Sequence, residues 1–523
     1  MTTAARTLNL GTRAIPFTLP NRRDARLHTA AVIISIHTIG LLALGFRVSV
    51  PQILSAILTA AILDVTVTYA RSGVLVWPAS GMLTGSGVAL ILRLVGMGSG
   101  EYWSWEGWYW YSLVAGVSLA TKFVIRWRGE HIFNPSNVGL VAAFLIIGSG
   151  VVEPLDFWWA PMGPWMVAVY AIIIGGGIII TRRLHLLEMA VVYWLTFALG
   201  QGILAASGHC MTAAWSPTPV CDLSYWSVVV TSPEVLIFIF FMITDPKTIP
   251  GGRAARVMFA LSLAGASTLL MAPQTTEFGA KVALLGSLAL WSPLRFLFAW
   301  LAPAQRTERA GVLSLVDRLV TGTEPRGVFG RGFALGLATV VVATAILAAG
   351  TPARQALAEP SVPVVEVDVD SASLPVVEID DSVAGLAIDI DAEFAAAIGL
   401  TLAENLAIEA EAVRYVNGGL LAGADAGLRL DEMQATIDAA TATGVRPVTT
   451  HHFDTMLLRS GREEMGQSGG ALVIVGTGIA ETVDLDPFQN ELDRHTTPFS
   501  ADFVLSQIAG DRWLIVDVVP GSG

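Results

Sequence analysis

Long apolar stretches recur through the first 350 residues of the chain and strongly restrict how it can fold. Over the whole sequence, 53% of the residues are hydrophobic and 14% are charged. A stretch of roughly 16–22 apolar residues is long enough to cross a bilayer as a helix. The pattern predicts a polytopic α-helical membrane protein with about eleven spans, at residues 29–47, 52–70, 79–96, 108–126, 134–151, 162–181, 186–206, 227–243, 255–272, 279–301 and 332–350.

The basic residues alternate between the predicted loops, as they do in multi-pass proteins with basic cytoplasmic loops. If residues 1–27 are a cytoplasmic segment, the loops on that side hold most of the arginines and lysines. The opposite loops hold little beyond Arg47 and Lys281. Arginine greatly outnumbers lysine, which is typical of a GC-rich bacterial genome. We therefore expect a bacterial inner (cell) membrane protein with a cytoplasmic loop at 303–331 and an extracytoplasmic C-terminal region.

Charge divides the chain into two regions. Residues 351–523 hold 28 of the 43 acids and 8 of the 31 bases. This predicts that residues 351–523, which follow the eleventh span at 332–350, are mostly soluble, whereas the spans lie in lipid. Residues 351–393 are expected to be an acidic linker. Acids alternate with apolar residues around 364–370 and 388–391, which indicates either a cation site or a solvated strand or tether, and we favour the second.

Residues 394–523 carry patterns of both helix and strand. Helical spacing covers about 395–442, with a glycine-rich break at 418–427. Three strand-like runs follow, at 446–458, 471–484 and 497–518. Two helices followed by long strands resemble the NTF2-like cone fold, so the fold class is a membrane bundle plus an extracytoplasmic α+β domain. Three polar residues on the first run either line a pocket or lie exposed, and we favour exposure: His451, His452 and Asp454.

Cys210 and Cys221 are the only cysteines in the chain. Both lie in one loop that the span count places outside the cytoplasm. Because an oxidising exterior permits disulfides, we predict that the two cysteines are bonded to each other.

Two polar turns interrupt the apolar pattern. Asn134 and Pro135 open the fifth span, and the segment 244–248 (Thr-Asp-Pro-Lys-Thr) follows the eighth. The plainest interpretation is a capped helix start and a helix exit. However, the predicted orientation puts both turns on the inner side, where interrupted helix ends often form ligand sites. We therefore predict a polar site where the turns meet.

A run of small residues, 80–87, lies in the third span. Small residues permit close packing of helices, and they also leave room for a flat ligand. The third and eighth spans correspond if the first ten spans form two inverted five-helix halves. The residues predicted to contact a ligand are Thr84, Asn134, Ser136, Asn137, Thr244, Asp245 and Thr248.

The two turns also resemble a known family. The segment 133–135 with Gly139, and the segment 240–248, are similar to motifs of the RnfD/NqrB family, whose members are ten-span subunits of bacterial ion-pumping respiratory complexes. The resemblance covers about residues 28–302 and is nearest to the stand-alone UnbU-type branch assigned to enediyne biosynthesis. The eleventh span and the C-terminal domain are additions to the ten-span pattern.

The resemblance implies bound flavin. Family members carry a riboflavin-type flavin in the bundle and an FMN joined through phosphate to a threonine. The loop expected to bear that threonine, 151–161, contains no serine or threonine. We therefore expect noncovalent riboflavin or FMN.

Three functions compete at this point. The leading one is a flavin-containing electron carrier that works with redox partner proteins in the lipid bilayer. The second is a transporter or channel for a flavin or a secondary metabolite, and the third is a membrane-anchored scaffold. The sequence indicates no nucleic-acid partner, metal-ligand cluster, haem motif or hydrolase triad. His131 and His185 are expected at the inner membrane interface.

Overall fold

The computed structural model describes residues 5–10, 13–21, 24–98, 100–157, 162–301, 340–358, 365, 367, 369–386, 390–461, 471–509 and 512–521. The chain forms two compact units. The membrane unit comprises Met1–His209 and Cys221–Pro352, and the C-terminal unit comprises Cys210–Val220 and Ala353–Gly523. Each unit is built differently and is described separately below.

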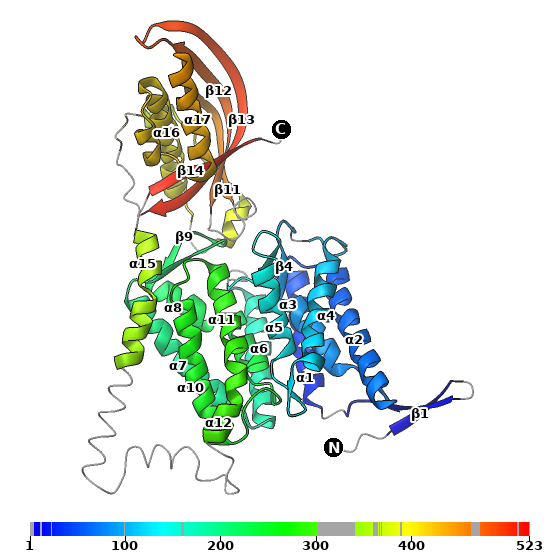
Figure 1. Cartoon of the computed structure of the whole chain (residues 1–523). Helices are drawn as coiled ribbons and strands as arrows, with labels where there is room; N and C mark the ends of the chain where they lie inside the picture. The colour runs from blue at the N-terminus through cyan, green and yellow to red at the C-terminus, as the bar shows by residue number, and fades with distance from the viewer. Residues whose placement is uncertain are drawn as a thin grey trace, which may run out of the picture. The chain divides into compact units, whose positions relative to one another are not determined.

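Helices lie in each of the first ten predicted spans, and they pack side by side in the membrane unit (Figure 1). Seven helical segments of the described part are long and apolar enough to cross a membrane. The apolar helix in the eleventh predicted span, Val340–Arg354, is shorter than these seven. Residues 332–339 of that span lie outside the described residues. The helices are α1 (Ala25–Ala43), α2 (Val50–Ser72), α3 (Ala79–Ile91), α4 (Trp108–Val124), α5 (Pro135–Ile146), α6 (Pro164–Arg183), α7 (Leu187–Ala206), α8 (Asp222–Thr231), α9 (Pro233–Ile237), α10 (Arg253–Met271), α11 (Glu277–Trp291) and α12 (Arg295–Leu301).

The surface of these helices carries many large apolar side chains. Leu42, Ile62, Ile146 and Leu199 are each at least 65% exposed. Such a surface is unfavourable in water and suits contact with lipid tails. The described part of the chain therefore has the features of a helical membrane protein, which agrees with the apolar pattern of the sequence.

Helices α3 and α5 are short, and a strand follows each of them. Helix α3 ends at Ile91, and Leu92, which has extended backbone angles, begins strand β4 (Leu92–Leu94). Strand β7 (Val152–Pro154), which follows α5, pairs antiparallel with β4. Pairing satisfies backbone groups that a broken helix would otherwise leave unbonded within an apolar bundle. The third predicted span, 79–96, is thus a shorter helix plus a strand.

Local sequence explains where several helices begin. Ser49 and Gln52 form a reciprocal capping box at the start of α2. Asn134 caps α5, and Pro135 takes the first helical position, where its missing N–H has no intrahelical partner to lose. Both starts follow the helix-start chemistry visible in the sequence.

The remaining short elements of the membrane unit flank the helices. They are β1 (Ala5–Leu10), β2 (Arg13–Thr18), β3 (Leu75–Val76), β5 (Arg126–Trp127), β6 (Glu130–His131), the π-helix η1 (Phe238–Met242) and the 3₁₀ turn η2 (Ser292–Leu294). Strands β1 and β2 form an antiparallel hairpin, and β3 adds to β2 in parallel.

A short hairpin carries the two cysteines. Strands β8 (Cys210–Ala213) and β9 (Ser216–Cys221) pair with each other. Both cysteines are disulfide-bonded. Because the chain has no other cysteine, the bridge closes this hairpin.

The C-terminal unit is a five-stranded sheet with two helices against one face (Figure 1). The sheet order is β10-β11-β12-β13-β14, antiparallel except for the parallel pair β10–β11. The elements are α15 (Thr351–Ala358), η4 (Ser371–Ser373), β10 (Val377–Ile379), η5 (Asp381–Gly385), α16 (Ala392–Tyr415), η6 (Gly418–Gly423), α17 (Gly427–Thr443), β11 (Arg446–Ser460), β12 (Leu472–Leu485), β13 (Glu491–Ala509) and β14 (Arg512–Pro520).

Part of the expected linker belongs to this fold. Strand β10, inside the stretch 351–393, adds to the edge of the sheet beside β11. Val377, Val383 and Leu386 are buried in the main apolar core of the unit. Residues 377–386, predicted as part of the linker, thus form an edge strand with a following turn. Of the two alternating stretches, residues 364, 366 and 368 of the first and residues 388 and 389 of the second lie outside the described residues.

Candidate functional site

The two polar turns predicted from the sequence lie against each other. The Asn134 side chain, at the start of α5, donates a hydrogen bond from Nδ2 to the backbone oxygen of Met242 at 3.3 Å. Met242 is the last residue of the π-helix η1, and one residue, Ile243, separates it from the 244–248 turn. Asn134 is buried, so this bond joins the two interrupted helices inside the protein.

Arg295 connects the 244–248 turn to a further loop. Its guanidinium donates to the backbone oxygen of Lys247 and, at 3.2 Å, to that of His131. It also pairs with Glu130 at 3.1 Å. The Arg295 side chain is buried, and its Nε has no hydrogen-bond partner among the described residues. The Nε–H of Arg295, at the junction of the two turns, is therefore a donor without a partner among the described residues.

The predicted ligand residues mostly satisfy one another. Five side chains donate within or between the turns and their helices: Thr84 to Ser80, Ser136 to Asn134, Asn137 to Leu285, Thr244 to Phe240 and Thr248 to Asp245. Asp245 accepts from the backbone N–H of Lys247 at 3.1 Å. The hydroxyl and carboxylate oxygens retain lone pairs, because each is able to accept more than one hydrogen bond. Asn134 is the predicted residue that bonds across to the other segment, at Met242. Asn137 bonds to Leu285 on α11, and Ser136 lies beside Gly87 of α3, the helix that carries Thr84.

The glycines of the third span serve helix packing. A Cβ built on Gly81 would lie 2.6 Å from the backbone oxygen of Ala60, and one on Gly85 would lie 2.7 Å from the Cα of Ile57. Helices α2 and α3 therefore approach as closely as small residues allow. Of the two interpretations of the 80–87 run, the structure supports close packing.

An ion pair between Lys122 and Asp64 joins helix α4 to helices α2 and α3. Lys122 on α4 donates to Asp64 on α2 and to the hydroxyl of Ser80, both at 3.0 Å. The other oxygen of Asp64 accepts from the backbone N–H of Gly81 at 3.0 Å. These contacts give Lys122 a structural role in joining α2, α3 and α4.

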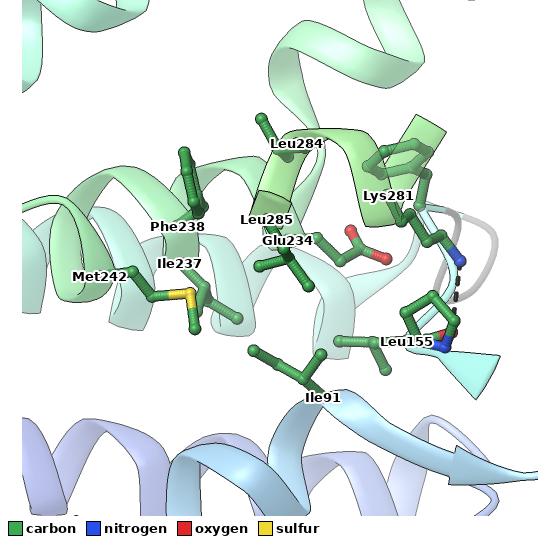
Figure 2. A pocket seen from close by; sticks show the side chains of 11 residues that line it. Ile91, Leu155, Glu234, Ile237, Phe238, Met242, Lys281, Leu284 and Leu285 are labelled. Atoms are coloured by element: carbon green, nitrogen blue, oxygen red, sulfur yellow. Dashed lines mark hydrogen bonds between the residues drawn. The ribbon is translucent and has the colours of Figure 1, made fainter. Parts of the chain in front are cut away.

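A second polar site, which sequence reasoning missed, surrounds a small cavity deep in the bundle (Figure 2). Its walls come from α3, β7 and the residues just after it, α9, η1 and α11, and they are almost entirely apolar. Glu234 lies between the apolar end of the cavity, near Met242, and the end near Lys281 (Figure 2). Both carboxylate oxygens of Glu234 are buried and have no hydrogen-bond partner among the described residues. The space open to the centres of water molecules is about 30 Å³.

Lys281 is held by acids other than Glu234. Its ammonium group lies 2.8 Å from Glu277 and 3.4 Å from Asp156. It also donates to the backbone oxygen of Pro154 at 3.4 Å. The Lys281 and Glu277 side chains are 4% and 3% exposed, so this pair is removed from water. Lys281, expected in an outside loop, is therefore a buried residue of α11.

The sequence analysis passed over the signal that could have indicated this site, which is an acid inside a predicted span. Glu234 falls within the predicted span 227–243, and ionisable residues in membrane helices usually face the protein interior and have a function. The partners of Glu234 come from segments that are distant in the sequence. Their proximity was not predictable without the packing of α11 against the β7 loop.

The three polar residues predicted on the first strand-like run lie on β11, where successive side chains point to opposite faces of the sheet. The ring of His451 packs among Phe453, Phe499 and Phe503, whereas His452 and Asp454 are exposed. Burial and the nearby Arg429 lower the pKa of His451 to about 4. Exposure was therefore the right interpretation for two of the three residues and wrong for His451.

The C-terminal unit also buries an acid pair. Glu409 on α16 forms a double hydrogen bond with Arg429 on α17, at 2.7 and 2.6 Å. Burial, and then the adjacent carboxylate of Glu409, raise the pKa of Asp425 to about 10. Asp425 thus carries a proton at neutral pH.

Replacing Asp425 with asparagine is expected to flatten the pH dependence of the unit's stability. The unfolded state loses the Asp425 proton near pH 4 and the folded state near pH 10, so stability falls as pH rises between these values. The slope contributed by one such group is up to about 1.4 kcal/mol per pH unit. Hydrogen exchange of amides in α16 and β14 across this pH range would measure the change. Exposed Asp431, also on α17, gives the control Asp431→Asn, and equal slopes in both variants would contradict the prediction.

No protein-family model matches the chain, and no curated protein matches it. The likeness to the RnfD/NqrB family therefore rests on the two short motifs and their positions in the spans.

Proposed function

We propose that the chain is a flavin-binding membrane electron-transfer protein, similar to RnfD/NqrB subunits, with an NTF2-like C-terminal domain. The observation that carries the proposal is the contact between the two motif-bearing turns, from Asn134 Nδ2 to the Met242 oxygen. Turns that are more than one hundred residues apart in the chain form one polar junction at interrupted helix ends. Such ends supply oriented donors to anionic or carbonyl-rich ligands.

The groups at this junction fit a flavin in charge and hydrogen bonding. The buried Arg295 Nε is a donor without a protein partner among the described residues. Burial, and then the nearby Lys247 and Lys122, lower the pKa of His131 to about 4. Lys247, Lys122 and Arg295 thus bring positive charge near the junction. Cationic donors suit the carbonyl edge of an isoalloxazine ring and the phosphate of FMN. The cavity beside Glu234 is too small for such a ring.

A bound flavin would supply the redox chemistry, because its ring both accepts and donates electrons. The chain's own residues would bind and orient it. Asn134 and Ser136 at the start of α5, Thr248 in the opposite turn and Arg295 would hold its polar edge. The surrounding apolar helices would exclude water.

The first test is an absorption spectrum of the detergent-purified protein, followed by acid precipitation. A flavin band that moves to the supernatant supports a noncovalent cofactor. A band retained in the pellet contradicts the noncovalent part of the proposal. No band, after expression with ample riboflavin, overturns the proposal.

A variant locates the flavin. Asn134→Ala removes the bond between the turns and is expected to lower flavin content severalfold. Thr38→Ala removes an exposed hydroxyl on α1 that bonds only within its own helix, and should leave flavin content unchanged. Equal flavin content in both variants places the flavin away from the turns.

Transport of a small molecule is the second candidate function. The short helices α3 and α5, which pass into paired strands, favour it because broken helices often surround transporter sites. Uptake of riboflavin into proteoliposomes, in the absence of any bound flavin, would favour transport over electron transfer.

A further inference from the structure

The cavity beside Glu234 is of a size for water and is too small for an organic ligand. A cavity needs about 10–15 Å³ of this kind of volume to hold one water molecule. The observed 30 Å³ corresponds to roughly two water molecules. The ligand of the Glu234 carboxyl group must therefore be small, which leaves water, a proton or a small ion.

The backbone around Glu234 is irregular. Ser232 and Pro233 interrupt the span and start α9, so Glu234 lies in the first turn of a new helix. The next turn is the π-helix η1, in which the N–H of Ile243 bonds to the oxygen of Phe238 at 3.0 Å. Single π turns inside helices frequently occur at functional sites. The irregularity and the unbonded carboxyl group are independent observations in one span.

The charged groups around Glu234 are unbalanced. The titratable and charged groups that interact electrostatically with Glu234 come from β4, the segment after β7, α6 and α11. They are Arg93, Asp156, Tyr170, Glu277 and Lys281. Three acids, counting Glu234, thus accompany two cations. Lys281 is already bonded to Glu277 and Asp156. A third carboxylate in an apolar cavity is costly unless it takes up a proton.

Lys281 links the cavity to a partly exposed acid. Asp156 is 24% exposed, whereas Lys281, which contacts it, is buried and lines the cavity. Water in the cavity would complete a chain from Asp156 through Lys281 to Glu234. Chains of ionisable groups and water are the usual route of protons in membrane proteins.

We propose that the Glu234 carboxyl group binds and releases a proton inside the membrane unit, through water in the cavity that it shares with Lys281. The proton adds to a carboxylate oxygen and leaves from the same oxygen to water, so no other reactant is needed. This role does not depend on bound flavin. The cavity adjoins the polar turns, because Met242 and Leu285 line it and their backbone oxygens accept hydrogen bonds from Asn134 and Asn137.

Infrared difference spectroscopy of the full chain in lipid tests the proposal, with Asp425→Asn as the parent protein because Asp425 in the C-terminal unit also holds a proton. The parent should show the C=O stretch of a protonated carboxyl group, which shifts in D₂O and disappears as pH is raised. Glu234→Gln should lose this band, and Glu188→Gln, a partly exposed acid on α7 that pairs with Arg253, should keep it. A band lost in Glu188→Gln, retained in Glu234→Gln or unable to exchange in D₂O would overturn the proposal.

A measurement on the wild-type protein covers the case in which Glu234→Gln does not fold. Carbodiimides of low polarity react with protonated carboxyl groups in apolar surroundings. Mass spectrometry should find the label on the Glu234 peptide, with several-fold less label at high than at low pH. No label on Glu234 at any pH would overturn the proposal, whether or not the protein contains flavin.

Discussion

Lys281→Met is expected to unfold or strongly destabilise the membrane unit. The substitution keeps the length and apolar stem of the side chain but removes the cation that pairs with Glu277 at 2.8 Å and with Asp156 at 3.4 Å. Removing one partner of a buried ion pair costs about 3–5 kcal/mol, because the other charge stays buried without compensation. The expected result is a large loss of monodisperse protein after mild heating, measured by size-exclusion chromatography.

A second substitution separates charge from packing in this experiment. If the uncompensated carboxylate causes the loss, Lys281→Met combined with Glu277→Gln should recover part of the stability. Arg253→Met is the matched control. It breaks a pair with Glu188 in which the side chains are 42% and 33% exposed, and exposed pairs contribute only about 0–1 kcal/mol. Equal losses in Lys281→Met and Arg253→Met would contradict the expectation.

Gly85→Ala is expected to force helices α2 and α3 apart. Its Cβ would lie 2.7 Å from the carbonyl carbon of Ala56 and 2.7 Å from the Cα of Ile57, and backbone atoms cannot rotate away. Overpacking of this kind costs about 1–3 kcal/mol, occasionally more. The melting temperature of the detergent-purified protein should fall on the order of 5 °C.

Gly87→Ala gives a control on the same helix. The added Cβ would lie 3.5 Å from the side chain of Ser136, an ordinary contact distance. Both substitutions gain the same helix propensity, about 0.5–1 kcal/mol, so the difference between them measures packing alone. If Gly85→Ala melts at the temperature of Gly87→Ala, the helices are not as close as the structure places them.

Local features of this protein were accessible from the sequence. Apolar stretches fixed the positions of the helices, because the helix must hide its backbone polar groups from lipid. Asn134-Pro135 fixed the start of α5, and alternation along β11 left His452 and Asp454 exposed. The single pair of cysteines indicated where a disulfide was to be expected. Each of these inferences depends on neighbours within a few residues or on composition.

Only the tertiary structure decided which distant residues meet. Whether the 80–87 run accommodates a ligand or a neighbouring helix depends on the position of α2, and the backbone of Ala56 and Ala60 settles it in favour of packing. The sequence likewise indicates a loop position for Lys281, whereas in the structure α11 buries it against Asp156. The cavity beside Glu234 is formed by segments that are far apart in the sequence. Burial, pairing and packing are sums over contacts between remote segments, so a pattern read along one stretch of chain does not contain them.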